Sequence, residues 1–251
     1  MKKLSILFVL ILCLAACSKQ ESNLFINGAV KGLKEGTLYL QKIEDTVLVT
    51  IDSLEVKGDP NFVFETNIES PQVMYLFLKK MDGSSYNDRL LFFAEPGEMS
   101  VTTTLKNFET DVVVEGSVNH KKLEEHRKIM ERFNDQNLDL IKISLEAQKA
   151  GNEELVAETN LKFDNLLKRR YLYTVNFALN NKDYEVAPYL AVSEIFDANI
   201  KYLDTIQKSL SPEVRDSKYG KSLTDFIKER RKLETKAAAP VAEVTAEQVE
   251  G

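Results

Sequence analysis

The amino-acid sequence predicts an α+β protein, in which an N-terminal antiparallel β-sandwich precedes an all-helical region. From Leu24 to about Gly116, short apolar or alternating runs recur between turn signals, as they do in sandwiches and barrels. After Gly116, strand-forming residues become scarce and Lys, Glu, Leu and Asn take their place. Apolar residues there recur at helical spacing, which predicts a long helical hairpin and several shorter helices.

Strand-like runs in the N-terminal region are short and end at Gly, Pro, Asn or Asp. Phe62 and Phe64 bracket Val63, so a strand there would bury one face and leave the other partly wet. Pro96-Gly97 fits the central positions of a type II turn, and we expect the two flanking runs to form a hairpin. The runs expected to be strands are 25–30, 37–41, 47–51, 62–66, 73–78, 90–94, 99–105 and 112–115.

Two long amphipathic segments follow, and the short break at Gly151-Asn152 should let them fold back as an antiparallel hairpin. Asn119 is of the residue type that caps a helix, and we expect it to cap the first of the two. The residues expected on the apolar faces of this pair are Leu123, Met130, Phe133, Leu140, Leu145, Val156, Phe163, Leu166, Leu167, Tyr173 and Phe177.

Shorter helices are expected after the polar stretch 180–183. The first spans 184–196 with Pro188 in its opening turn, and a second spans 199–210. Ser211-Pro212 is a favourable helix start, with Ser as the cap and Pro at the first position. A last helix is expected over 217–234.

Changes in composition divide the 251 residues into five segments. The second segment is small and polar like a tether, and the last is Ala, Val, Glu and Pro without an apolar period, which predicts disorder. We expect a signal peptide at 1–16, a tether at 17–23, a β-sandwich domain at 24–116, a helical domain at 117–235 and a disordered tail at 236–251.

The first seventeen residues have the marks of a secretory signal peptide: two lysines, an apolar run, and small residues before the cut. The run ends in Leu14-Ala15-Ala16-Cys17, which resembles a bacterial lipoprotein signal. Cleavage would fall between Ala16 and Cys17, and Cys17 would carry the lipid. The alternative is an uncleaved membrane helix, but the run has only about 13 apolar residues and a span needs roughly 20.

The signal predicts a location in the cell envelope, with the membrane as a partner through the N-terminal lipid. Ser18 is not the aspartate that retains some lipoproteins at the inner membrane, so the outer membrane is favoured. Both its periplasmic face and its outer surface stay open as alternatives.

Charge and cysteine content exclude several classes of function. The formal charge is −6, and loss of Lys2 and Lys3 with the signal makes it −8, so we expect no nucleic-acid partner. Of two cysteines, Cys13 would leave with the signal and Cys17 would be acylated. We therefore expect no CxxC redox chemistry, no cysteine nucleophile and no thiolate metal site.

Several short motifs, in their order along the chain, resemble a known family. Phe25-Ile26-Asn27-Gly28, Gly36-Thr37-Leu38-Tyr39, Ile51-Asp52-Ser53 and Glu95-Pro96-Gly97 resemble an N-terminal β domain of unknown function in envelope lipoproteins of Bacteroidota. The helical region is similar to the linker of those proteins, notably at Ser217-Lys218-Tyr219-Gly220. In many members a thioredoxin-like domain of the peroxiredoxin type follows, but this sequence offers no position for its CxxC. The resemblance thus implies fold and compartment without redox activity.

Few residues have the types and spacing of a catalytic site. Asp52-Ser53 is interpreted as a strand-end turn, since the β region holds no histidine to activate the serine. His120 and His126 are six residues apart, share a helix face poorly, and are expected to be solvated. The pairs Glu124-Glu125 and Glu153-Glu154 are helix neighbours that diverge in direction.

Basic and aromatic clusters each allow two interpretations. The triplets 168–170 and 230–232 are expected to be solvated faces paired with nearby glutamates, with an anionic headgroup or glycan contact as the alternative. The aromatic residues are expected to pack in the core, with a ligand-stacking patch as the alternative. They are Tyr171, Tyr173, Phe177, Tyr184 and Tyr189.

Three classes of function are compatible with the sequence. The favoured one is a non-enzymatic lipoprotein that binds or scaffolds a partner protein or a nutrient in the envelope. The second is an accessory that docks on a separate thioredoxin-like protein, and the third is an enzyme of unrecognised type. No catalytic residue, cofactor or metal ligand is predicted, and the only modified position expected is Cys17.

Overall fold

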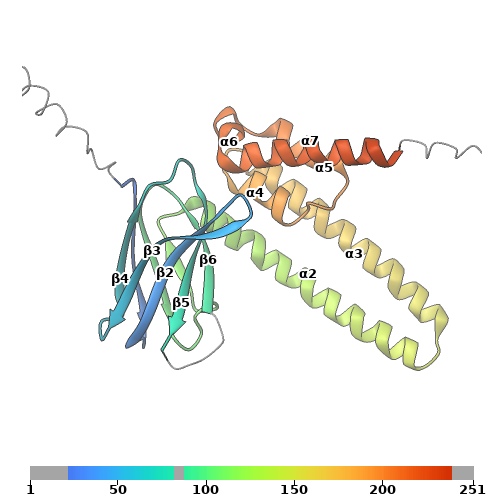
Figure 1. Cartoon of the computed structure of the whole chain (residues 1–251). Helices are drawn as coiled ribbons and strands as arrows, with labels where there is room; N and C mark the ends of the chain where they lie inside the picture. The colour runs from blue at the N-terminus through green and yellow to red at the C-terminus, as the bar shows by residue number, and fades with distance from the viewer. Residues whose placement is uncertain (1–21, 82–87, 239–251) are drawn as a thin grey trace, which may run out of the picture. The chain divides into compact units, whose positions relative to one another are not determined.

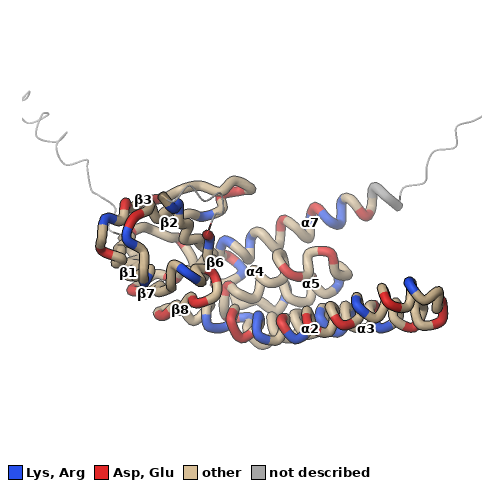
Figure 2. The backbone as a smooth tube through the Cα atoms, turned by 90° about the horizontal axis from the view of Figure 1, so that it is seen from below, with Lys and Arg blue, Asp and Glu red and all other residues tan. Residues whose placement is uncertain are grey.

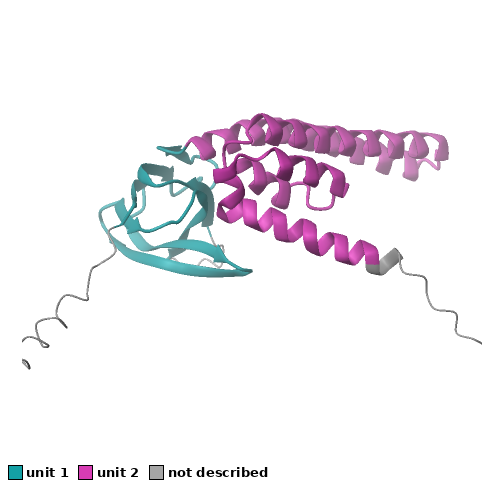
Figure 3. Ribbon diagram, turned by 90° about the horizontal axis from the view of Figure 1, so that it is seen from above, with its two compact units in different colours: residues 1–117 teal, residues 118–251 magenta. Residues whose placement is uncertain are grey.

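The computed structural model describes residues 22–81 and 88–238, with side chains described up to residue 235. The chain divides into two compact units, residues 1–117 and 118–251 (Figure 3). The predicted signal peptide with its Ala16–Cys17 cleavage site and lipidation position, most of the tether, and the tail from residue 239 lie outside the described residues.

The first unit is a sandwich of two four-stranded sheets (Figure 1). One sheet has the order β4-β1-β7-β8 and the other β3-β2-β5-β6. Every run expected to be a strand is one, so the predicted α+β class with an N-terminal sandwich is confirmed. The strands are β1 (Leu24–Lys31), β2 (Glu35–Glu44), β3 (Val47–Lys57), β4 (Asn61–Thr66), β5 (Gln72–Lys80), β6 (Asp88–Ala94), β7 (Gly97–Thr104) and β8 (Val113–Glu115).

Pairing differs from the prediction at the Pro96-Gly97 turn. The expected hairpin is wrong, because β6 ends in one sheet and β7 begins in the other, so the turn carries the chain between sheets. Gly97 has φ 119°, and its N–H donates to the carbonyl of Asn23 at 2.7 Å, which aligns β7 with β1. The β1–β7 pair is parallel, unlike the antiparallel pairs formed by the other described strands.

Inward-facing apolar residues of both sheets form one core. Phe62 and Phe64 are buried with their ring centroids 5.6 Å apart, while Val63 between them points to solvent, as the alternation predicts. Gly28 on β1 lies under the ring of Phe62 and the carbonyl of Val101, where a Cβ would not fit. Glycine at this position therefore allows the two strands beside it to close over the core.

Asp52 and Ser53 lie inside β3 and not at a strand end, so that part of the prediction is wrong. The register between β2 and β3 shifts at Leu40/Gln41, which leaves Ile51 as the extra residue of a β-bulge. The bulge lets the strand continue past Asp52 instead of turning. Both side chains are exposed, and the Ser53 N–H donates to the Asp52 carboxylate at 2.7 Å.

The second unit is entirely helical in its described part (Figure 1). Its longest helices form the predicted antiparallel hairpin, and the shorter helices pack on α3 and on each other. Gly151, at φ 68°, ends the first helix, and the Asn152 side chain caps the second by accepting from the Leu155 N–H at 3.0 Å. The helices are α2 (Val118–Lys149), α3 (Glu153–Asn180), α4 (Val186–Ser193), α5 (Ile200–Ser209), α6 (Pro212–Asp216) and α7 (Lys218–Ala238).

Asn119 caps a different helix from the one predicted. It lies in the first turn of α2, where its Oδ1 accepts from the N–H of Val186, the first residue of α4, at 2.8 Å. The residue at the N-cap of α4, Glu185, makes no side-chain cap of its own. Asn119 therefore satisfies an otherwise uncapped N–H from a helix more than sixty residues away.

Candidate interaction surface

The helical hairpin has two parts with different surroundings. The hairpin base comprises residues 118–133 of α2 and 170–180 of α3, and the hairpin arm comprises residues 134–169. Contacts of α4 and α5 with the hairpin involve residues such as Val175 and Ala178, which belong to the base. The candidate residues from the sequence lie in both parts.

His126 lies in the hairpin base and is 1% exposed. Its Nε2 is 3.0 Å from the hydroxyl of Thr174, and its ring lies 5.3 Å from that of Phe177 and 5.7 Å from that of Tyr173. Burial, with smaller contributions from Arg170 and Arg127, lowers the pKa of His126 to about 4. The imidazole is therefore neutral at neutral pH and holds α2 to α3.

His120 is also buried, and burial lowers its pKa despite Glu124, whose carboxylate lies 3.9 Å away. The expectation that both histidines are solvated is thus wrong. Six residues on a helix do separate the two rings around its axis, but α3 and α4 both contact α2 here. Several sides of one helix are covered, so residues on different faces are buried together.

Polar side chains at the base link α2 to the start of α4. Asn119 donates through Nδ2 to the carboxylate of Glu185 at 3.1 Å. Lys122 donates to the Asn181 side chain at 2.6 Å and lies 4.4 Å from the ring centroid of Tyr184. These groups interact with one another, and their contacts hold the hairpin base to the start of α4.

The five predicted aromatic residues do not form a single patch. Tyr173 and Phe177 stack with His126 and Phe133 between α2 and α3. Tyr171 packs at the edge of the apolar core that α3, α4, α5 and α7 form within the helical unit, and Tyr189 lies edge-on to Tyr219 at 5.1 Å. Each of these aromatic residues packs against a different set of neighbours. Their role in the described structure is therefore packing, as expected.

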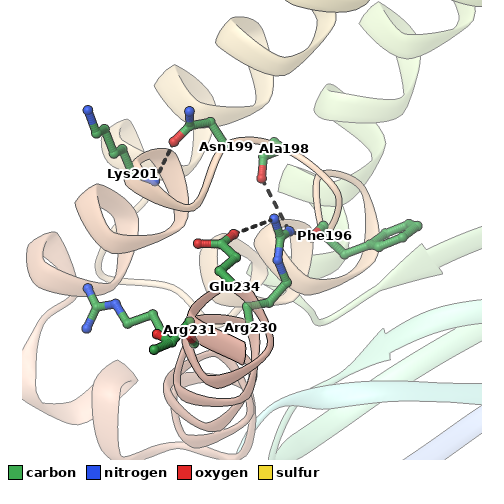
Figure 4. A network of polar contacts seen from close by, with 8 residues as sticks. Phe196, Ala198, Asn199, Lys201, Arg230, Arg231 and Glu234 are labelled. Carbon is green, nitrogen blue, oxygen red and sulfur yellow. Dashed lines mark hydrogen bonds and ion pairs between the residues drawn. The ribbon is translucent and has the colours of Figure 1, made fainter. Parts of the chain in front are cut away.

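Each basic triplet pairs in part with a nearby glutamate, as expected, since Arg170 joins Glu194 at 3.2 Å and Lys232 joins Glu229 at 2.6 Å. Arg231 donates to both carboxylate oxygens of Asp204 at 2.6 and 2.7 Å. Arg230 donates to the Glu234 carboxylate at 3.3 Å and to the carbonyls of Phe196 and Ala198 (Figure 4). These contacts hold α7 against the α4–α5 connection, which is a structural role.

Of the predicted carboxylate pairs, Glu124 joins Arg127 at 3.0 Å, and Glu153 and Glu154 are exposed in the first turn of α3. Within the described ranges, no group of three or more His, Cys, Asp or Glu residues is placed to hold a metal ion.

An open pocket of about 400 Å³ lies at the tip of the arm. Its one carboxylate is that of Glu153, and Asn152 in it is engaged as the cap of α3. The lining contains no second ionisable group that would converge with Glu153 on a ligand. The lining residues are Gln148, Gly151, Asn152, Glu153, Val156, Ala157 and Asn160.

Apolar side chains along one side of the arm point to solvent. Leu138 and Leu145 are 63% and 60% exposed, and Ile141 between them is 39% exposed. Their spacing of three and four residues places them on one side of α2, and we call these three residues the arm stripe. Single exposed leucines are common on soluble proteins, but an aligned series on one helix face is typical of helix docking surfaces.

The arm stripe shares a face of the hairpin with Leu167. Ile141 and Leu145 each follow an inward-facing residue of α2 by one position, and Leu167 follows the buried Leu166 in α3. In two antiparallel right-handed helices, the positions just after inward-facing residues lie on the same face of the pair. The opposite face carries the polar contact between Arg169 and Gln136, in which Arg169 donates at 3.1 Å, and the exposed Ile143.

Sequence reasoning placed Leu145 and Leu167 on apolar faces buried in the hairpin, and the structure leaves both exposed. The inward seam of the arm is made by Leu166, as predicted, and by small residues such as Ser144, Ala147 and Thr159. Leu138, Ile141 and Leu145 at i, i+3 and i+7 could have been recognised as a second apolar stripe beside this seam. Helix periodicity alone does not say which of two stripes faces the partner helix.

Comparison with known families finds a match, and its range corresponds closely to the first unit. The model of a domain of unknown function, DUF4369, matches residues 24–123. This stretch carries a DUF4369 domain. The match covers the whole sandwich and ends a few residues into α2. No curated protein matches the chain, and no solved structure does.

None of the helices in the described part combines the length and apolar character that a bilayer span requires.

Proposed function

We propose that this protein is a lipid-anchored, non-enzymatic module of the cell envelope that binds or scaffolds a partner through its helical unit. The observation that carries the proposal is the arm stripe, a row of solvent-exposed Leu and Ile on one face of the hairpin arm. Lys122 and His126 of the hairpin base, and Glu185 beside it, support the proposal, because they are engaged in contacts between helices.

The anchor is proposed from the sequence Leu14-Ala15-Ala16-Cys17. One acyl chain holds a protein on a membrane only marginally, whereas two or more hold it stably. A lipidated Cys17 would therefore keep the DUF4369 domain and the helical unit at the membrane, with the outer membrane as the favoured location. The tether at 17–23 would give the folded part freedom to reach a partner.

The DUF4369 match supports the resemblance to envelope lipoproteins of Bacteroidota, since that resemblance rests on motifs within residues 24–123. In such proteins a thioredoxin-like domain often follows the helical region. An accessory role beside a separate thioredoxin-like protein is therefore the second candidate.

The anchor is tested by metabolic labelling with a palmitate analogue, followed by membrane fractionation. The expected result is label on the wild type, and no label with release or failed processing for Cys17→Ser. A wild type that stays in the membrane without label would overturn the anchor, whatever the result for partner binding.

The binding role is tested by pull-down from solubilised envelopes with the wild type and with Leu138→Glu/Leu145→Glu. We expect a stoichiometric partner on the wild type and its loss from the double variant. Leu161→Glu is the matched control, because Leu161 is 64% exposed on the arm but lies on another side of α3. A partner retained by the double variant would show that the arm stripe does not bind it, and recovery of a thioredoxin-like protein would favour the accessory role.

A further inference from the structure

We propose that a second copy of this chain covers the arm stripe, with the two α2 helices packed antiparallel about a two-fold axis near Ile141. The inference rests on the proposed binding role of the hairpin arm and names its occupant. It is carried by the symmetry of the stripe, by the charges beside it, and by what covers the rest of the hairpin.

The arm stripe is nearly symmetric about its middle residue. Leu138 lies three positions before Ile141 and Leu145 lies four positions after it, and polar Asn134 and Gln148 continue the same spacing at the two ends. Reversing the helix direction about Ile141 therefore places Leu138 of one copy beside Leu145 of the other. A two-fold interface requires such self-complementarity, because the same patch serves both partners.

Charges on the outer side of the arm stripe, away from α3, are acidic toward the base and mainly basic toward the tip, where Glu146 lies between two lysines. Glu131 and Asp135 lie toward the hairpin base, and Lys142 and Lys149 lie toward the tip. All four side chains are exposed, and none forms an ion pair with another residue in the described ranges. Figure 2 shows how charges of both signs follow one another along α2 and α3.

Antiparallel pairing makes the charges at the two ends of the stripe attractive, while the two Lys142 side chains lie near the axis. With the axis at Ile141, Lys149 of one copy is level with residue 133 of the other, between Glu131 and Asp135. The two-fold axis repeats the contact at the other end of the stripe. Parallel pairing would instead place like charges opposite each other, so the charges select one direction as well as one partner.

The arm is also the part of the hairpin that lacks a second layer within the described structure. At the base, α4 and α5 pack on α3 and bury Val175 and Ala178. On the arm, the seam between α2 and α3 contains Ser144, Ala147, Thr159 and Leu166, and the leucines of the arm stripe lie outside it. Two hairpins joined by these leucines form a four-helix bundle, in which each helix has neighbours on two sides.

Cysteine crosslinking of the full chain in its own membrane tests both the contact and its direction. Ile141→Cys lies at the proposed axis, and oxidation or a short bis-maleimide should convert most of it to a product of twice the chain mass. Gln148→Cys alone should not self-crosslink, since two such positions are separated by about 20 Å along antiparallel helices. Mixing Gln148→Cys with Asn134→Cys chains should restore the crosslink.

Ile143→Cys is the matched control, since Ile143 is exposed on the same helix but precedes the inward-facing Ser144 and so lies on the opposite face. Equal crosslinking of Ile141→Cys and Ile143→Cys would overturn the proposal, as would self-crosslinking of Gln148→Cys. A product of Ile141→Cys that contains a different protein would reject the second copy and keep the proposed binding function. No product, together with no partner in the pull-down, would reject both.

Charge-swap variants test the same interface in solution by sedimentation of the detergent-solubilised chain. Lys149→Glu should weaken self-association several-fold, and Glu131→Lys combined with Lys149→Glu should restore it, because the charges are exchanged at both ends. Leu145→Glu should weaken it by about tenfold or more, since a charge would enter the centre of the interface. A wild type that sediments as a monomer at micromolar concentration, or a swap that fails to restore association, contradicts the proposal.

Discussion

The base and the arm of the hairpin are built from the same two helices, yet they bury different kinds of side chain. The base encloses Leu123, His126 and Thr174. The arm keeps Ser144 and Thr159 inside and leaves Leu138 and Leu145 in water. The difference follows from the neighbours: α4 and α5 complete a core around the base, whereas the described part of the chain provides no such layer around the arm.

Apolar residues of one helix can therefore have different roles at different points along its length. At the base, apolar and aromatic residues contribute to the stability of the fold. On the arm, similar residues contribute little to the fold and are available for binding. Substitutions in the two parts should therefore have effects of very different size on the stability of the fold.

The largest effect is expected for Leu123→Ala in the base, because Leu123 is 2% exposed and its removal leaves a cavity. Substitutions of this kind lower the free energy of unfolding by about 2–5 kcal/mol. Urea unfolding of the full chain, followed by helical circular dichroism, measures the change. A loss below about 1 kcal/mol would mean that the base is not the stable part of the hairpin.

Acidification should destabilise the base through His126. Its pKa is about 4 in the folded protein and near 6.5 when unfolded, so protons bind the unfolded state more tightly. Stability from this group is complete above about pH 6.5, is lost as the pH falls toward 4, and changes little below that. The loss is on the order of 2–3 kcal/mol by linkage.

His126→Gln keeps a polar side chain that cannot titrate, and it should flatten this part of the pH profile of unfolding. Carboxylates contribute to acid unfolding in both proteins, so the informative quantity is the difference between the two profiles from pH 7 to pH 4. Parallel profiles would mean that His126 becomes protonated in the folded protein at little cost.

Loss of a cap at the base should exceed loss of a cap at the tip. Asn119→Ala removes the buried side-chain acceptor of the Val186 N–H and one bond to the Glu185 carboxylate, which costs about 1–3 kcal/mol. Asn152→Ala removes an exposed cap. The Leu155 N–H that donates to this cap can then bond to water, so the loss costs about 1 kcal/mol. Both changes are measured by the same urea titration. A larger effect at Asn152 would contradict the proposed difference between base and tip.

The architecture could be predicted because local patterns determine it. Alternation around Val63, the glycine at 97 and the break at Gly151-Asn152 each leave a mark within a few residues, and the corresponding elements are present. The pairing of β1 with β7 could not be predicted in this way. The turn at Pro96-Gly97 has the same local chemistry whether it joins strands of one sheet or carries the chain between two.

The candidate surface depended on contacts between distant residues, and there the sequence was misleading. His120 and His126 were expected in solvent, because helix spacing says nothing about α3 and α4 arriving on different sides of α2. Asn119 has the chemistry of a cap, but the helix that it caps begins at Val186. The arm stripe was hidden because a leucine at helical spacing fits a buried face as well as an exposed one.

The smallest effect on folding is expected for Leu145→Ser on the arm. Leu145 is 60% exposed, so its substitution removes little buried area, and surface changes of this kind usually stay within about 0.5 kcal/mol. Urea titration of dilute monomer isolates this term from any association. The same substitution should nevertheless weaken binding at the arm stripe, so one residue separates stability from interaction. A loss above about 2 kcal/mol in the dilute monomer would mean that Leu145 is part of the core, and the distinction between base and arm would then fail.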